Sequence, residues 1–235
     1  MKELKKLIEN LNKKNKEELV KILQVIGAKL INEYKIQVGN LTIEPLWIEA
    51  YYYSKNFPDC NTHMNEKQKN HFGQLYFHEK GWGGFDICLS NSDDYYLSFL
   101  LKATLINGVF IKQTGIYEML EKAGTTKEKL EKEKNILIKR KTNLNYEICF
   151  AQRVGITKPC YREEELAIFS INTLTKEGYD FEFARKSLTP IAEQKIKQYI
   201  IDNPHATKRE CKAKCKKLFG WTPDIITDLV KDLEQ

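Results

Sequence analysis

The chain has 235 residues, of which 42% are hydrophobic, and a formal net charge of +6 with a pI near 8.8. This length suits one sizeable domain with a small appendage, and no apolar run is long enough to span a bilayer. The mild positive charge permits an anionic partner such as nucleic acid but does not require one.

Two features of the sequence predict a cytoplasmic protein. Residues 2–16 are charged and lack the separate apolar region of a signal peptide. The cysteines are scattered and do not show the dense framework of a small secreted domain, so we expect a reducing compartment. They are Cys60, Cys88, Cys149, Cys160, Cys211 and Cys215.

Helical spacing of apolar residues opens the chain. It predicts amphipathic helices over residues 2–12 and 16–33, the second with Asn15 as its N-cap. Gly27 falls inside the second helix, where it marks either a close packing contact or a break.

Strand patterns fill most of the middle of the chain. They predict strands at residues 34–38, 41–53, 74–78, 85–89, 95–105 and 166–171, extended segments at 136–141 and 147–154, and short helices at 114–123 and 125–134. The strands at 74–78 and 85–89 are joined by a glycine-rich turn and form a hairpin.

The pattern becomes helical after about residue 174. Thr189 and Pro190 predict the start of one helix, and Thr207 predicts the N-cap of a basic helix that ends at Gly220. We therefore divide the chain into a domain at 1–173 and a helical extension at 174–235 with helix-turn-helix character.

One strand carries the residue with the most chemical potential, Glu49. Alternation places Trp47, Glu49 and Tyr51 on one face and Ile48, Ala50 and Tyr52 on the other, apolar face. A carboxylate among aromatic rings is either a general base with a raised pKa or a structural charge paired with Lys102 or Arg153. Lys102 interrupts an apolar strand, so it should meet a carboxylate, a phosphate or a pocket.

In their order and spacing, these segments resemble the alkyladenine (3-methylpurine) DNA glycosylases over about residues 19–171. The matching segments are the helix at 19–31, Glu49-Ala50-Tyr51, Gly73-Gln74-Leu75-Tyr76-Phe77-His78, Leu100-Leu101-Lys102 (Lys for the family's Arg) and Arg153-Val154-Gly155. The resemblance implies an α+β fold with a curved antiparallel β-sheet core and N-terminal helices, to which this chain adds a helical C-terminal appendage.

Members of that family flip a damaged purine out of duplex DNA and hydrolyse its N-glycosidic bond. By resemblance, Glu49 would activate the attacking water and Tyr51 would stack on the flipped base. The resemblance implies a monomer that acts on damaged, alkylated DNA in base-excision repair without a metal or other cofactor. The lack of a long apolar run predicts that there is no membrane partner.

Further residues take roles from the same resemblance. His63, Tyr76 and His78 would complete the walls of the base pocket. Lys102 and Arg153 either hold phosphates beside the extruded nucleotide or pair with carboxylates.

The DNA-contacting surface departs from the family. Trp82 stands at the hairpin tip where the family has a Tyr that wedges into the duplex, so either Trp82 contacts DNA in its place or the wedge is absent. Cys88 or a neighbour stands where the family has an Asn. In the extension, Lys208, Arg209 and Lys212 either contact DNA or form the solvated face of a helical cap.

Alternatives remain for both metal binding and function. Cys211, Cys215 and His205 would supply three zinc ligands, but a fourth ligand and the short Cys-x-x-Cys spacing are lacking, so we expect no metal. The alternatives to a glycosylase are a non-catalytic nucleic-acid or nucleobase binding protein on the same fold and a nucleoside or nucleotide hydrolase that uses Glu49.

Overall fold

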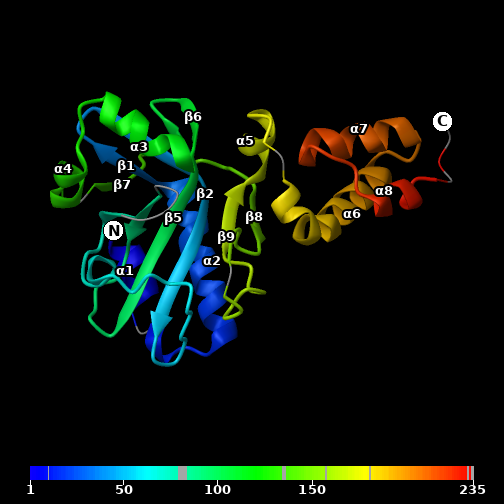
Figure 1. The fold of residues 1–235 in the computed structure, drawn as a ribbon. Helices are drawn as coiled ribbons and strands as arrows, with labels where there is room; N and C mark the ends of the chain where they lie inside the picture. The colour runs from blue at the N-terminus through cyan, green and yellow to red at the C-terminus, as the bar shows by residue number, and fades with distance from the viewer. Residues whose placement is uncertain are drawn as a thin grey trace.

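The computed structural model describes residues 1–9, 11–78, 84–133, 136–156, 158–179, 181–231 and 233. Within them the protein has an α+β fold, with helices before and after one curved antiparallel sheet (Figure 1), which confirms the predicted fold class. The strands are β1 (Tyr34–Val38), β2 (Leu41–Ser54), β3 (Gln74–Phe77), β4 (Phe85–Cys88), β5 (Tyr95–Ile106), β6 (Val109–Lys112), β7 (Leu137–Lys139), β8 (Ile148–Ala151) and β9 (Ala167–Ser170). The helices are α1 (Lys2–Ile8), α2 (Lys16–Glu33), α3 (Gln113–Lys122), α4 (Lys127–Lys132), α5 (Ile171–Lys176), α6 (Arg185–Asp202), α7 (Lys208–Phe219) and α8 (Asp224–Leu229), with 3-10 turns η1 (Leu11–Lys13), η2 (Glu66–Gln68) and η3 (Glu182–Ala184).

The sheet is built around its two longest strands, β2 and β5. The strand order is β3-β4-β5-β2-β1-β7, with β6 paired to β5 and β9 paired to both β2 and β8. In the register of β2, Glu49 lies opposite Leu100 of β5 on one side and Ala167 of β9 on the other. Glu49 is therefore at the centre of the sheet, with a strand on each side.

The two faces of β2 differ as the alternation predicts. Ile48, Ala50 and Tyr52 are fully buried in a first hydrophobic core, which includes the apolar faces of α1 and α2. Glu49 and Tyr51 lie on the opposite face, where their side chains are hydrogen-bonded to each other. The strand thus separates an apolar core from a face that carries polar chemistry.

Helix α2 covers the apolar face and ends where the sequence predicts. The Asn15 side chain caps it by accepting a hydrogen bond from the backbone N–H of Glu18 at 2.9 Å. A Cβ atom at Gly27 would lie 2.9 Å from Cδ1 and 3.2 Å from Cβ of Ile168 in β9. Gly27 is therefore a close packing contact between helix and sheet, not a break in the helix.

The Gly27 contact gives a stability prediction. Gly27→Val should lower the free energy of unfolding by about 1–3 kcal/mol, because overpacking forces β9 away from α2. Urea denaturation measures this, with Val25→Ala at an exposed position of the same helix as the control. An unchanged midpoint for Gly27→Val would contradict the contact.

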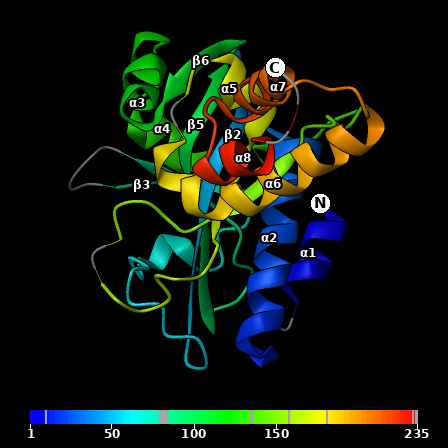
Figure 2. The ribbon, with the colours of Figure 1, turned by 90° about the vertical axis from the view of Figure 1, so that its right-hand side faces the viewer.

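The C-terminal helices pack onto the sheet through a second hydrophobic core. This core joins residues of α5 to α8 to Leu46, Trp47, Ala103 and Phe169 of the strands. Figure 2 views the molecule from the side of these helices, with α6 and α8 in front of the sheet. Helix α5 follows β9 directly, so the extension begins at the sheet without a separate linker.

The helix ends in this region agree only partly with the sequence patterns. The predicted start at Thr189 and Pro190 is wrong: α6 begins at Arg185, Pro190 lies inside it, and the Thr189 hydroxyl donates to the Arg185 carbonyl at 2.7 Å. The turn η3 runs directly into α6 and starts the helix one turn earlier. The cap at Thr207 and the left-handed end at Gly220 are confirmed. No helix in the described ranges has both the length and the apolar composition of a membrane span.

Candidate functional site

Glu49 is a fully buried carboxylate with a partner on each oxygen. Its Oε1 accepts a hydrogen bond from the backbone N–H of Val154 at 2.8 Å, and its Oε2 accepts one from the Tyr51 hydroxyl at 3.1 Å. The Lys102 ammonium lies 3.9 Å from Oε2 and 5.5 Å from the centre of the Trp47 ring. Of the three partners predicted for Lys102, the structure shows the carboxylate.

Burial and the neighbouring groups shift the pKa of the Glu49 carboxyl in opposite directions. Burial raises the pKa of Glu49 above its ordinary value of 4.5, while the Lys102 charge, the Val154 N–H and the Tyr51 hydroxyl act to lower it. Burial, with the charge of Glu49 as the next cause, raises the pKa of Tyr51 well above 10.0. Tyr51 therefore remains a hydrogen-bond donor to Glu49 at every physiological pH.

Removing the lysine charge should shift the titration of Glu49. In Lys102→Met the pKa of the Glu49 carboxyl should rise further, because the charge that favours its ionised form is gone. The ¹³C shift of labelled glutamate side chains, followed against pH, measures this. Lys112→Met, whose ammonium lies over the Tyr179 ring, is the control, and equal titration curves in the two variants would refute the coupling.

Arg153 is buried and holds structure together instead of facing solvent. Its Nη1 donates to Asp59 at 2.6 Å and to the Ala50 carbonyl at 3.1 Å, and its Nη2 donates to the Tyr161 carbonyl at 3.2 Å. Its guanidinium carbon lies 4.7 Å from the centre of the Tyr51 ring. The structure thus favours the carboxylate pairing over the phosphate contact, and Arg153 fixes both the Tyr51 ring and the neighbouring Val154.

A disulfide between Cys60 and Cys160 joins the loop after β2 to the loop after β8. Asn61 donates to the Cys160 carbonyl at 2.8 Å and Lys158 donates to the Cys60 carbonyl at 2.7 Å, so the same two loops are also joined by hydrogen bonds. The sequence reading of scattered, reduced cysteines missed this bond because its residues are 100 positions apart. A reducing compartment does not favour such a bond, and the cytoplasmic location stays a prediction.

Tyr76, His78 and His63 form one aromatic cluster. The His63 and His78 rings are 4.3 Å apart between centroids, the Tyr76 and His78 rings are 5.1 Å apart, and His63 Nδ1 lies 3.4 Å from the Tyr76 hydroxyl. Partial burial, and then the neighbouring His78 ring, lower the pKa of His63. The three predicted wall residues therefore lie together.

Asp86 connects this cluster to the face that carries Glu49. Cross-strand partners share a face, and the register pairs Glu49 with Leu100, Leu100 with Asp86, and Asp86 with Tyr76. Asp86 is buried and its Oδ1 lies 2.8 Å from Nε2 of His78.

The other oxygen of Asp86 is also held. Its Oδ2 accepts hydrogen bonds from Ser98 at 2.6 Å and from Gln68 at 3.2 Å. Sequence reasoning missed Asp86, Ser98 and Gln68. The signal was present in the hairpin, since residues at 76 and 86 fall on its polar face.

The described residues that were predicted to contact DNA do not lie near Glu49 or the aromatic cluster. Trp82 lies outside the described residues. Lys208, Arg209 and Lys212 are on α7, which Figure 1 shows well apart from β2. Cys211 and Cys215 are buried in the second core, and across the described ranges no group of three or more His, Cys, Asp or Glu residues is placed to hold a metal ion.

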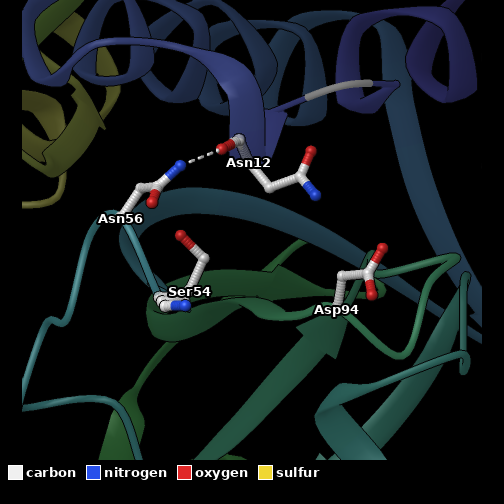
Figure 3. Close-up of a pocket in the computed structure, with 5 residues that line it drawn as sticks. Asn12, Ser54, Asn56 and Asp94 are labelled. Atoms are coloured by element: carbon white, nitrogen blue, oxygen red, sulfur yellow. Dashed lines mark hydrogen bonds between the residues drawn. The ribbon is translucent and has the colours of Figure 1, made fainter.

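A polar cavity of about 310 Å³ lies at the end of β2 (Figure 3). It is lined by Asn12, Ser54, Lys55, Asn56 and Asp94, and the Asn56 amide donates to the Asn12 carbonyl at 2.8 Å. None of these five residues is Glu49, one of its contacts Tyr51, Lys102 and Val154, or a member of the aromatic cluster. We therefore take the face around Glu49, not this cavity, as the candidate site.

The candidate site thus combines a buried carboxylate, two fixed donors and a cation with a set of aromatic rings farther along the same face of the sheet. This combination can orient a water molecule and stabilise positive charge beside a planar group. No model of a protein family matches the chain, and no curated protein matches it either. The function is therefore inferred from the geometry of this site.

Proposed function

We propose that the protein is a DNA N-glycosylase that removes an alkylated purine, with Glu49 as the base that activates water. The observation that carries the proposal is the environment of Glu49: a carboxylate with a raised pKa, held by Val154 and Tyr51 on the sheet face that also bears Tyr76 and His78. A raised pKa brings a carboxylate closer to the operating pH, which suits a general base.

The carboxylate retains capacity for a water molecule. An ionised carboxylate has about four acceptor sites, and Val154 and Tyr51 occupy two of them. In the proposed reaction the water oxygen bonds to the anomeric carbon and Glu49 accepts the water proton. The glycosidic bond breaks with its electron pair on the base, which neutralises the charge of a cationic alkylated purine.

The aromatic residues would receive the base itself. Stacking of a nucleobase on an aromatic ring contributes about 1–3 kcal/mol. Tyr51, with its ring fixed from one side by Arg153, would present its other face to the base. Tyr76 and His78 lie at the β3 edge of the same sheet, with β4 and β5 between them and β2, and His63 packs against them from the loop after β2. Tyr51 would therefore link the two parts of the site, since its hydroxyl holds Glu49 while its ring receives the base.

The test is release of free base from a duplex with a single alkylated purine, measured by chromatography with a chelator present. We expect base release that the chelator does not diminish, and no hydrolysis of free nucleosides. Absence of base release from every alkylated duplex tried would contradict the proposal. Equal cleavage of free nucleosides would favour a nucleoside hydrolase instead.

One observation favours a second candidate function, a nucleic-acid binding protein without catalysis. Glu49 is closed off from solvent and lies 3.9 Å from Lys102, which is also how a purely structural ion pair is arranged. Such a protein would bind a duplex with an extruded base and leave the glycosidic bond intact. The base-release assay separates the two, since only the enzyme frees the base.

A further inference from the structure

Helix α7 concentrates the positive charge of the protein. It carries six Lys or Arg residues and one Glu, a net charge of +5 in a chain whose formal net charge is +6. Its apolar side, with Cys211, Cys215 and Phe219, is buried in the second core. At about 100° per residue, Lys208, Arg209, Lys212 and Lys216 fall along one flank of the helix, which we call the basic stripe.

The basic stripe differs from the exposed lysines that three other helices pair with an acid. In α2, α3 and α6, exposed lysines pair with a glutamate four residues away, as in Lys21–Glu17, Lys122–Glu118 and Lys197–Glu193. None of the four stripe residues forms an ion pair with any residue that the structure describes.

The single acid of α7 does not neutralise the stripe. The Glu210 carboxylate accepts hydrogen bonds from the backbone N–H and the hydroxyl of Thr207, at 2.8 and 3.0 Å, in the capping box of the helix. Lys208 and Lys212, and Lys212 and Lys216, are like charges four residues apart, and each such pair destabilises a helix by about 0.2–0.5 kcal/mol. The helix thus tolerates repulsion between its own lysines.

We infer that the basic stripe of α7 binds the phosphate backbone of a nucleic-acid duplex. The stripe rises about 12 Å from Lys208 to Lys216, so several side chains can reach successive phosphates. Helix α7 is also the second helix of the α6–turn–α7 pair, the position that enters the groove in helix-turn-helix proteins.

Two other anionic partners fit the stripe less well. A membrane-surface helix needs an exposed apolar face, and the apolar face of α7 is buried. Single-stranded nucleic acid is held by stacking on aromatic rings, and the stripe itself has none. A duplex needs only the charges that the stripe supplies.

This inference specifies how the proposed enzyme would hold its DNA, and it is tested without base release. Binding of an undamaged fluorescent duplex is measured by anisotropy at several salt concentrations. The test variant carries Lys208→Gln, Arg209→Gln, Lys212→Gln and Lys216→Gln. The control variant loses the same charge at ion-paired lysines, through Lys14→Gln, Lys21→Gln, Lys122→Gln and Lys197→Gln.

We expect the test variant to lose at least tenfold in affinity at low salt and the control variant to lose less than threefold. The slope of log affinity against log salt should become shallower by about 3–4 in the test variant, as expected for four phosphate contacts. Its thermal midpoint should not fall, since Gln suits a helix and repulsion is removed.

Three results would overturn the inference. They are equal losses in the two variants, wild-type affinity in the test variant, and binding of the wild-type protein to anionic vesicles but not to the duplex. Because binding is measured on an undamaged duplex, binding through the stripe together with no base release from the alkylated duplexes would contradict only the glycosylase proposal. If the test variant kept wild-type base release and wild-type duplex binding, only the inference that the stripe binds DNA would be contradicted.

Discussion

Glu49→Gln should abolish release of an alkylated purine and leave the fold intact. Removing a general base lowers a rate by about 10²–10⁴-fold, and glutamine has the same shape as glutamate but cannot accept the water proton. Its carbonyl oxygen can still accept from Val154, so the sheet face should not rearrange. Base release and the circular dichroism spectrum, measured on the same preparation, test both halves of the prediction.

The control lies on the same strand. Glu44 is also a carboxylate of β2, and it is paired with Arg140 at 2.6 Å, away from the aromatic cluster. Glu44→Gln should retain base release. If Glu49→Gln released base as fast as the wild-type protein, Glu49 would be a structural charge and the non-catalytic alternative would gain.

The same substitution changes how stability depends on pH. A carboxyl whose pKa is raised by folding binds more protons in the native state than in the unfolded chain between its ordinary value of 4.5 and its raised value. Glu49 therefore removes stability as pH rises through that window, and the full loss is present above it. Glu49→Gln should become more stable relative to the wild-type protein across this range, measured by urea denaturation at a series of pH values.

Arg153→Met should destabilise the protein by about 3–5 kcal/mol, because it leaves the buried Asp59 charge without its partner. The double variant with Asp59→Leu as well should recover much of the loss, since a buried ion pair replaced by apolar groups is often neutral. Urea denaturation of the two single variants and the double variant completes the cycle. A loss in the double variant equal to the sum of the two single losses would show that the two side chains do not interact.

A surface pair provides the reference for this cycle. Lys122 and Glu118 are both exposed on α3 and lie 2.7 Å apart. Exposed pairs contribute about 0–1 kcal/mol, so Lys122→Met should change stability little. The contrast between the two pairs would show that burial, and not the ion pair as such, sets the effect of losing Arg153.

Local sequence patterns predict those structural features that depend on residues a few positions apart. The alternation of β2, the cap at Asn15 and the hairpin at residues 74–88 follow from side chains a few positions apart, and the structure has them. The partner of Lys102 could be narrowed to a short set because an unpaired buried cation is so unfavourable.

Contacts between residues far apart in the chain could not be predicted from the sequence. Arg153 and Asp59 are 94 positions apart, and nothing in either segment indicates that they meet. Asp86 reads as a polar residue of a hairpin until the pairing of β4 with β5 places it on the face of Glu49. The Arg153–Asp59 contact depends on how loops fold over the sheet and the place of Asp86 depends on which strands pair, and local periodicity encodes neither.

The bond between Cys60 and Cys160 also changes the covalent topology of the protein. Residues 60–160 become a closed ring that contains β3 to β8, while β1, β2 and the C-terminal helices are open branches. A single proteolytic cut inside the ring should leave one covalent molecule that separates into two fragments only after reduction. A cut in a branch should release its fragment at once, so gels with and without a reducing agent would show on which side of the bond each cleavage lies.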